Sequence, residues 1–91
     1  MEYNPPTLFG ARLATIRKAR GWSQELLALK SGLARSYVGG IERGQRNLSL
    51  INICVLAHTL GVPPKELLDF LPAYAAPDDS AKEPPTDQKS E

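Results

Sequence analysis

Few side chains in this 91-residue sequence could ligate a metal ion or act as a nucleophile. The single cysteine, Cys54, and the single histidine, His58, are four residues apart, a spacing that can place two ligands on one face of a helix. Two ligands do not form a metal site, and no acidic residue or second thiol lies near them in the sequence. We therefore expect no metal and no cofactor. A redox-sensitive Cys54 is the alternative.

Enzymatic activity is not predicted either, because the sequence has no paired carboxylates, no glycine-rich phosphate loop and no catalytic triad. Its length suits one small domain. No apolar run reaches the roughly 20 residues of a membrane span, and no basic start with an apolar stretch suggests a signal peptide. One cysteine cannot form an internal disulfide, which is typical of a reducing compartment. These features predict a cytoplasmic protein.

The charge of the chain divides into two parts. Residues 1–71 carry nine lysines and arginines against five acids, a net charge of +4, whereas residues 72–91 carry two lysines against five acids, a net charge of −3. A basic domain attracts polyanions such as nucleic acid. A charge of +4 is also compatible with an ordinary protein surface, so charge alone does not decide.

The C-terminal segment 72–91 is acidic and rich in proline, alanine and serine, without a periodic apolar face. Such a composition buries too little apolar surface to offset the entropy lost on ordering. We expect a domain over residues 1–71 and a disordered tail over 72–91. The tail is either a solvated end or a weak competitor of DNA for the basic domain.

Apolar periodicity predicts five short helices in residues 1–71. The first helix is expected after Pro5 and Pro6, with Thr7 as its cap, and Gly21 ends it. The second begins at the cap Ser23, and the third runs from about Ala34 to Arg43. The fourth follows the cap Ser49 and ends at Gly61, and the fifth begins at Pro64. The expected buried stripe of the fourth helix comprises Leu50, Ile53, Leu56, Ala57 and Leu60.

The most informative segment is Ser23 to Gly44, in which two short helices flank Gly32. A glycine there can supply the positive φ of a sharp turn. This arrangement is typical of a helix-turn-helix, whose second helix enters the DNA major groove. From about Phe9 to Leu68, the chain resembles the Cro/C1-type (XRE) family of small bacterial and phage regulators. Restriction–modification controller proteins and small phage repressors are its most similar members.

The resemblance implies an all-α, compact five-helix, lambda-repressor-like DNA-binding domain. It also implies an ion pair between Arg17 and Glu42 that fixes the angle of the third helix. The family contacts DNA at positions that this chain fills with Gln24, Arg35, Ser36, Tyr37, Gly40, Arg43, Arg46 and Asn47. Arg35 would pair with guanine O6 and N7, and Gln24 and the loop residues would contact phosphates. For Tyr37, packing against the second helix is the alternative.

Three residues of the third helix depart from the family pattern. Ala34 replaces the usual Ser or Thr cap, a loss of about 1 kcal/mol. Gly39 and Gly40 lie within the helix, and each costs about 1 kcal/mol relative to alanine. Either the glycines allow the helix backbone to approach the duplex closely, or the third helix recognises DNA sequence only weakly.

Apolar residues also occupy positions where the family usually carries charges. Ile51 and Val55 are i, i+4 neighbours and form one stripe, which together with Leu68 and Leu71 predicts a homodimer interface. An apolar surface without a partner, or a shifted helix register, is the alternative.

The sequence thus predicts a homodimeric, sequence-specific transcription regulator of double-stranded DNA with an inverted-repeat operator, located in the cytoplasm at the bacterial nucleoid. No membrane partner is expected. No small-molecule ligand is expected either, because the length leaves no room for a ligand domain. An antitoxin-like module, or an adaptor whose main partner is a protein, is the alternative function.

Overall fold

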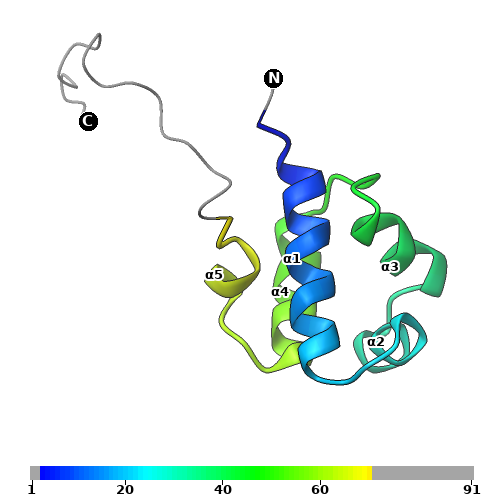
Figure 1. Ribbon diagram of the computed structural model, residues 1–91. Coiled ribbons are helices and arrows are strands. Elements are labelled where there is room, and N and C mark those ends of the chain that lie inside the picture. Colours follow the sequence, from blue (N-terminus) through cyan, green and yellow to red (C-terminus); the bar gives the residue numbers. More distant parts are fainter. Residues whose placement is uncertain (1–2, 71–91) are drawn as a thin grey trace, which may run out of the picture.

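The computed structural model describes residues 3–70. In this range the chain forms five helices and no strands: α1 (Pro5–Ala19), α2 (Gln24–Ser31), α3 (Arg35–Glu42), α4 (Leu50–Leu60) and α5 (Pro64–Leu67). In Figure 1, α2 and α3 lie on one side of α1 and α5 lies on the other. The predicted all-α, five-helix fold is confirmed for this range. Leu71 and the predicted tail 72–91 lie outside it.

Local sequence signals set the start of α2 and of α4. The hydroxyl of Ser23 accepts a hydrogen bond from the backbone N–H of Leu26 at 3.0 Å, and that of Ser49 accepts one from the N–H of Asn52 at 3.1 Å. Each hydroxyl satisfies a donor that has no partner within its helix. Gly32 ends α2 with a φ of 77°. These two caps and the turn glycine are therefore confirmed.

The predicted cap of α1 is wrong. The helix begins at Pro5, and the side chain of Asn4 is the cap, because its Oδ1 accepts from the N–H of Thr7 at 3.2 Å. Proline is compatible with the first helical position, where its missing N–H would have no partner within the helix. Thr7 is consequently inside the first turn rather than before it.

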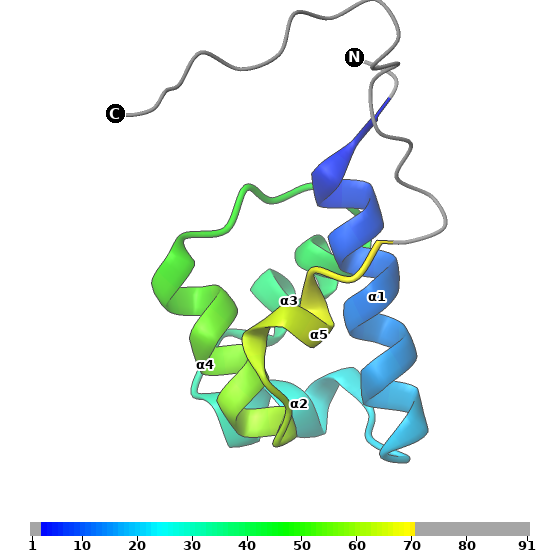
Figure 2. The same cartoon turned by 90° about the vertical axis from the view of Figure 1, so that its left-hand side faces the viewer.

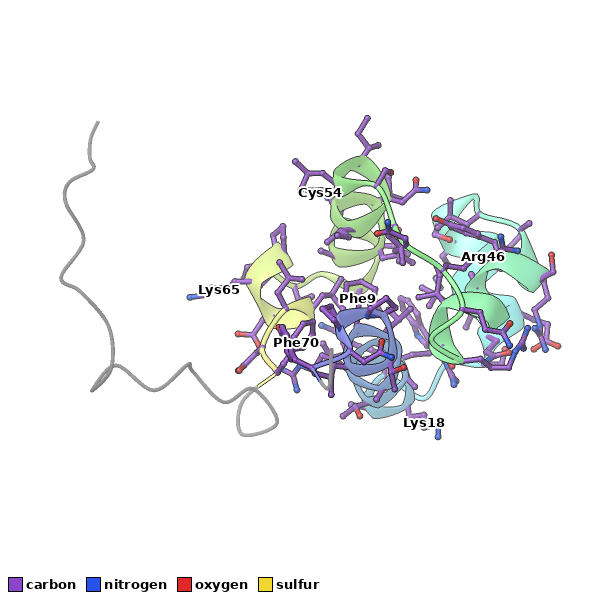
Figure 3. The ribbon with its side chains drawn as sticks, turned by 90° about the horizontal axis from the view of Figure 1, so that it is seen from above. Phe9, Lys18, Arg46, Cys54, Lys65 and Phe70 are labelled. Atoms are coloured by element: carbon purple, nitrogen blue, oxygen red, sulfur yellow. The ribbon has the colours of Figure 1, made fainter. Side chains whose placement is uncertain are left out.

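Within residues 3–70 one apolar core lies between the helices, and Phe9 is near its centre when the domain is seen from above (Figure 3). Its fully buried large side chains are Leu13, Leu27, Val38, Ile41, Leu56, Leu60 and Leu67. The predicted stripe of α4 holds except at Leu50, which is 73% exposed. Leu50 is the first residue of α4 and lies at the margin of its apolar face, so neighbouring helices do not cover it.

Gly10 brings α1 unusually close to the C-terminal end of α3. A Cβ atom at this position would collide with the carbonyl oxygen of Ile41 and lie 2.9 Å from that of Glu42. Only glycine allows this backbone contact. The orientation of α3 is therefore set partly by the backbone of α1.

The short helix α5 closes the opposite side of the domain. In Figure 2 it lies across α1 and α4. The guanidinium of Arg12 in α1 donates to the backbone oxygen of Glu66 at 2.6 Å and to its carboxylate at 3.0 Å. Leu67, the last residue of α5, is fully buried in the core. Among residues 3–70, no helix is long and apolar enough to cross a membrane.

Candidate nucleic-acid interface

A buried ion pair joins α1 to the last residue of α3. Arg17 donates from Nε and Nη2 to the two carboxylate oxygens of Glu42, at 2.7 and 2.9 Å, and from Nη1 to the backbone oxygen of Trp22 at 2.7 Å. The two side chains are 9% and 6% exposed. Hydrogen bonding to Glu42 raises the pKa of Arg17 above its ordinary value. The structure thus brings together the two residues that the family resemblance paired.

Gln24, the first residue of α2, extends this network. Its side-chain amide donates to Glu42 at 2.8 Å, and Glu42 also accepts from Arg17. The side-chain nitrogen of Gln24 is therefore engaged within the protein. A phosphate contact at Gln24 stays a prediction. The backbone N–H groups in the first turn of α2 are the other donors that could bind a phosphate there.

Arg35 and Ser36 are exposed at the start of α3, after Ala34, which makes no side-chain cap. The Nε of Arg35 lies 3.2 Å from the carboxylate of Glu25 in α2. Glu25 was not among the predicted site residues, because its partner lies ten residues away on another helix. The sequence did offer one signal for this pair: an acidic residue in the first turn of α2 and a basic residue in the first turn of α3.

Both glycines within α3 are covered by arginine side chains. A Cβ atom at Gly39 would lie 3.0 Å from Nη1 of Arg35 and 3.1 Å from Nη1 of Arg43. At Gly40 it would lie 3.0 Å from Nε of Arg46. The glycines therefore accommodate guanidinium groups along the helix surface, an arrangement that neither sequence interpretation included.

Tyr37 packs toward the protein in this structure. Its ring is half-buried against the core, and its hydroxyl accepts a hydrogen bond from the side chain of Asn52 in α4 at 3.0 Å. The guanidinium of Arg46 lies over the ring, 5.5 Å from its centre. Tyr37 thus packs against the core, with α4 rather than α2 supplying its hydrogen-bond partner, and a DNA contact of Tyr37 stays a prediction.

The loop after α3 carries the other predicted phosphate ligands, which are all exposed: Arg43, Arg46 and Asn47. Figure 3 places Arg46 on the side of the domain formed by α2 and α3. Arg43 donates from Nε to the side chain of Gln45 at 3.3 Å. Together with Arg35, the loop arginines form a group of three cations around one face of α3.

The predicted dimer residues do not all lie together. Ile51, which is 74% exposed, and Val55 line one shallow hollow beside the end of α2, with Cys54 and His58. Leu68 lines a different hollow with Phe70, and Leu71 lies outside the described residues. Within residues 3–70 no group of three or more potential metal ligands exists, so Cys54 and His58 have no further ligand there.

Several known proteins are similar to this chain. The control protein C.BamHI of Bacillus amyloliquefaciens is 48% identical over 71 residues, covering 77% of this chain and 88% of its own length. The crystal structure of the restriction–modification controller protein C.AhdI from Aeromonas hydrophila matches with a TM-score of 0.69 at 58% identity, over 71% of this chain and 98% of its own.

A second similar structure is a complex with DNA. The controller protein C.Esp1396I, as a tetramer with its natural 35 base-pair operator, matches at 32% identity with a TM-score of 0.64, over 74% of this chain and 99% of its own. The helix-turn-helix family model HTH_3 matches residues 13–67, most of the described domain. The family match and the two helices α2 and α3 on either side of the turn at Gly32 show that the chain belongs to the helix-turn-helix family.

Proposed function

We propose that this protein is a sequence-specific DNA-binding transcription regulator that acts as a homodimer on a short inverted-repeat operator. The main support is the cluster of three guanidinium groups around α3, which come from Arg35, Arg43 and Arg46. They surround a helix whose end is anchored by a buried ion pair. An anchored helix with cations on its outer face suits insertion into the major groove.

Base contacts come from the start and outer face of α3. Arg35 donates two hydrogen bonds to O6 and N7 of a guanine, the commonest specific contact in the major groove. The hydroxyl of Ser36 accepts or donates and so discriminates little between bases. Gly40 adds no side chain and leaves the adjoining space to Arg46. Tyr37 contributes the exposed part of its ring, against a thymine methyl or the DNA backbone.

Phosphate contacts position the domain without reading the sequence. The start of α2 at Gln24 binds one phosphate, where the helix dipole favours an anion. Arg43, Arg46 and Asn47 bind further phosphates along the loop. Because each contact releases counterions from DNA, affinity falls steeply as salt concentration rises.

The homodimer is supported by exposed apolar residues and by the relatives. Ile51 and Val55 line one hollow on α4, and Leu68 directly follows α5. Leu71 joins the proposed interface on the sequence alone. The related C.Esp1396I assembles several copies on one operator. Two-fold symmetry of a dimer matches an inverted repeat in the DNA. In this role the protein acts on bacterial DNA in the cytoplasm, responds to its own concentration, and catalyses no reaction.

Selection of bound duplexes from a random pool tests the function directly. The affinities of the selected duplex and of a scrambled duplex are then measured at two salt concentrations. We expect an enriched inverted repeat with a preference of roughly a thousandfold or more. Weak binding that depends steeply on salt, with no enriched motif, contradicts the proposal and favours the adaptor or antitoxin-like function.

A further inference from the structure

The carboxylate of Glu25 contacts the arginine that we propose as the base reader. Its Oε2 lies 3.2 Å from Nε of Arg35, across the turn between α2 and α3. A guanidinium has donors along two edges, and this contact uses the edge that includes Nε. The two terminal nitrogens, Nη1 and Nη2, form the other edge, which is the fork that fits guanine O6 and N7.

Gly39 of α3 also lies beside the guanidinium of Arg35. A Cβ atom there would lie 3.0 Å from Nη1 of Arg35, so the absence of a side chain at position 39 leaves room for this nitrogen beside α3. A larger residue at position 39 would displace Nη1. Glu25 and Gly39 together define where the guanidinium lies before DNA is present.

Glu25 remains ionised at neutral pH. Its pKa is lowered first by hydrogen bonding to its own backbone N–H and then by Arg35. The side chain is 70% exposed, and a pair this exposed contributes little to stability. A negative charge beside a surface that binds phosphates also repels DNA. An acid in the first turn also stabilises α2 through the helix dipole, but that effect does not require the contact with Arg35.

We infer that Glu25 is a specificity-determining positioning residue: it holds Nε of Arg35 so that the Nη1–Nη2 edge faces a guanine. The inference rests on the proposed DNA-binding function. Glu25 contacts no base itself. It reduces the conformational freedom that Arg35 loses on binding, and it weakens binding to duplexes that do not have a guanine for Arg35 to contact.

The test compares wild type with Glu25→Gln on the selected duplex and on a scrambled duplex at the same salt concentration. The variant keeps the shape of the side chain and removes its charge. We expect scrambled DNA to be bound equally or a few-fold more tightly, and the preference for the selected duplex to fall by roughly tenfold. Asp69→Asn is the matched control, because it removes an exposed acid far from Arg35 in the sequence and leaves the preference unchanged.

Two further measurements separate positioning from a general charge effect. In the first, guanines of the selected duplex are replaced one at a time by 7-deazaguanine, which lacks the N7 acceptor. We expect the replacement of one guanine to weaken binding of the wild type, and to weaken binding of Glu25→Gln less. In an Arg35→Ala background, Glu25→Gln no longer changes the preference. An equal change in both backgrounds overturns the inference, because Glu25 then acts independently of Arg35.

The preference of wild type among duplexes separates the role of Glu25 from DNA recognition as a whole. A specific wild type whose preference is unchanged by Glu25→Gln overturns the role of Glu25 and leaves the regulator intact. A wild type without any preference among duplexes overturns both. Circular dichroism of each variant verifies that the helices are retained.

Discussion

At the scale of single residues, two helical glycines have opposite surroundings. Gly10 faces the backbone of α3, which cannot move aside, whereas Gly39 faces the ends of two flexible arginine side chains. The same substitution by alanine should therefore have opposite effects on stability. This contrast separates a glycine that the fold needs from one that the binding surface uses.

Gly39→Ala should raise the free energy of unfolding by about 1 kcal/mol, because alanine has the higher helix propensity. The added Cβ displaces the terminal nitrogens of Arg35 and Arg43, so the preference for the selected duplex should fall. Urea denaturation and binding titrations measure the two effects. A variant that binds as well as wild type shows that Gly39 has no part in recognition.

Gly10→Ala should destabilise the domain by about 1–3 kcal/mol, the usual effect of overpacking. The added Cβ collides with the carbonyl oxygen of Ile41 and forces α1 away from α3. Urea denaturation measures the loss, with Ala11→Gly, an exposed neighbour in the same helix, as a control for propensity. Unchanged stability would show that the two helices separate easily.

Glu42→Ala should lower stability by about 3–5 kcal/mol, because it leaves the buried Arg17 without its counter-charge. Glu66→Ala, which removes the partly exposed partner of Arg12, should lower it by no more than about 1 kcal/mol. Thermal unfolding compares the two. Because Glu42 also holds Gln24, the folded fraction of Glu42→Ala should bind the selected duplex more weakly. Equal losses of stability would contradict the structural role of the buried pair.

At the scale of elements, α3 differs from α2 and α4 in having no side-chain cap. Ala34 has the extended backbone that a cap residue adopts, with φ −65° and ψ 143°. Ala34→Ser should therefore stabilise the protein by about 1 kcal/mol and raise the Tm by about 4–8 °C. Calorimetry measures the change in Tm. Ser49→Ala, which removes the cap of α4, should lower the Tm. A Tm unchanged by Ala34→Ser would mean that the new hydroxyl makes no cap.

The elements show which features a sequence can reveal. Ser23, Ser49 and Gly32 were predictable because a cap or a turn depends on residues a few positions away. Asn4 was missed because both Asn4 and Thr7 suit a cap beside two prolines. The burial of Leu50 was predicted wrongly because periodicity does not show where a neighbouring helix stops.

The candidate site was predictable to a smaller extent. The Arg17–Glu42 pair came from the family resemblance, since 25 residues separate its members. Glu25, Gly10 and the Arg12–Glu66 contact were not predicted, because each depends on how two helices meet. The positions of the arginines were identified, but their alignment along the glycines of α3 required the structure.

At the scale of the whole molecule, the exposed apolar residues make self-association testable. Ile51→Glu places a charge on the proposed α4 interface at a side chain that is 74% exposed, so the fold should tolerate it. We expect monomers by sedimentation equilibrium and weaker binding to an inverted repeat. Leu29→Glu, at an exposed leucine of α2, is the matched control and should stay dimeric. A dimer that survives Ile51→Glu places the interface elsewhere.

The three hydrogen bonds of Arg17 also have a consequence for motion. One side chain ties α1 to the turn at Trp22 and to the end of α3, so these parts cannot separate without exposing a buried charge. The amide protons at the end of α3 should therefore exchange with deuterium at the rate of global unfolding, although the helix is only eight residues long. Such a binding helix reaches DNA already folded, and its sequence preference is established by side chains rather than by ordering of the backbone.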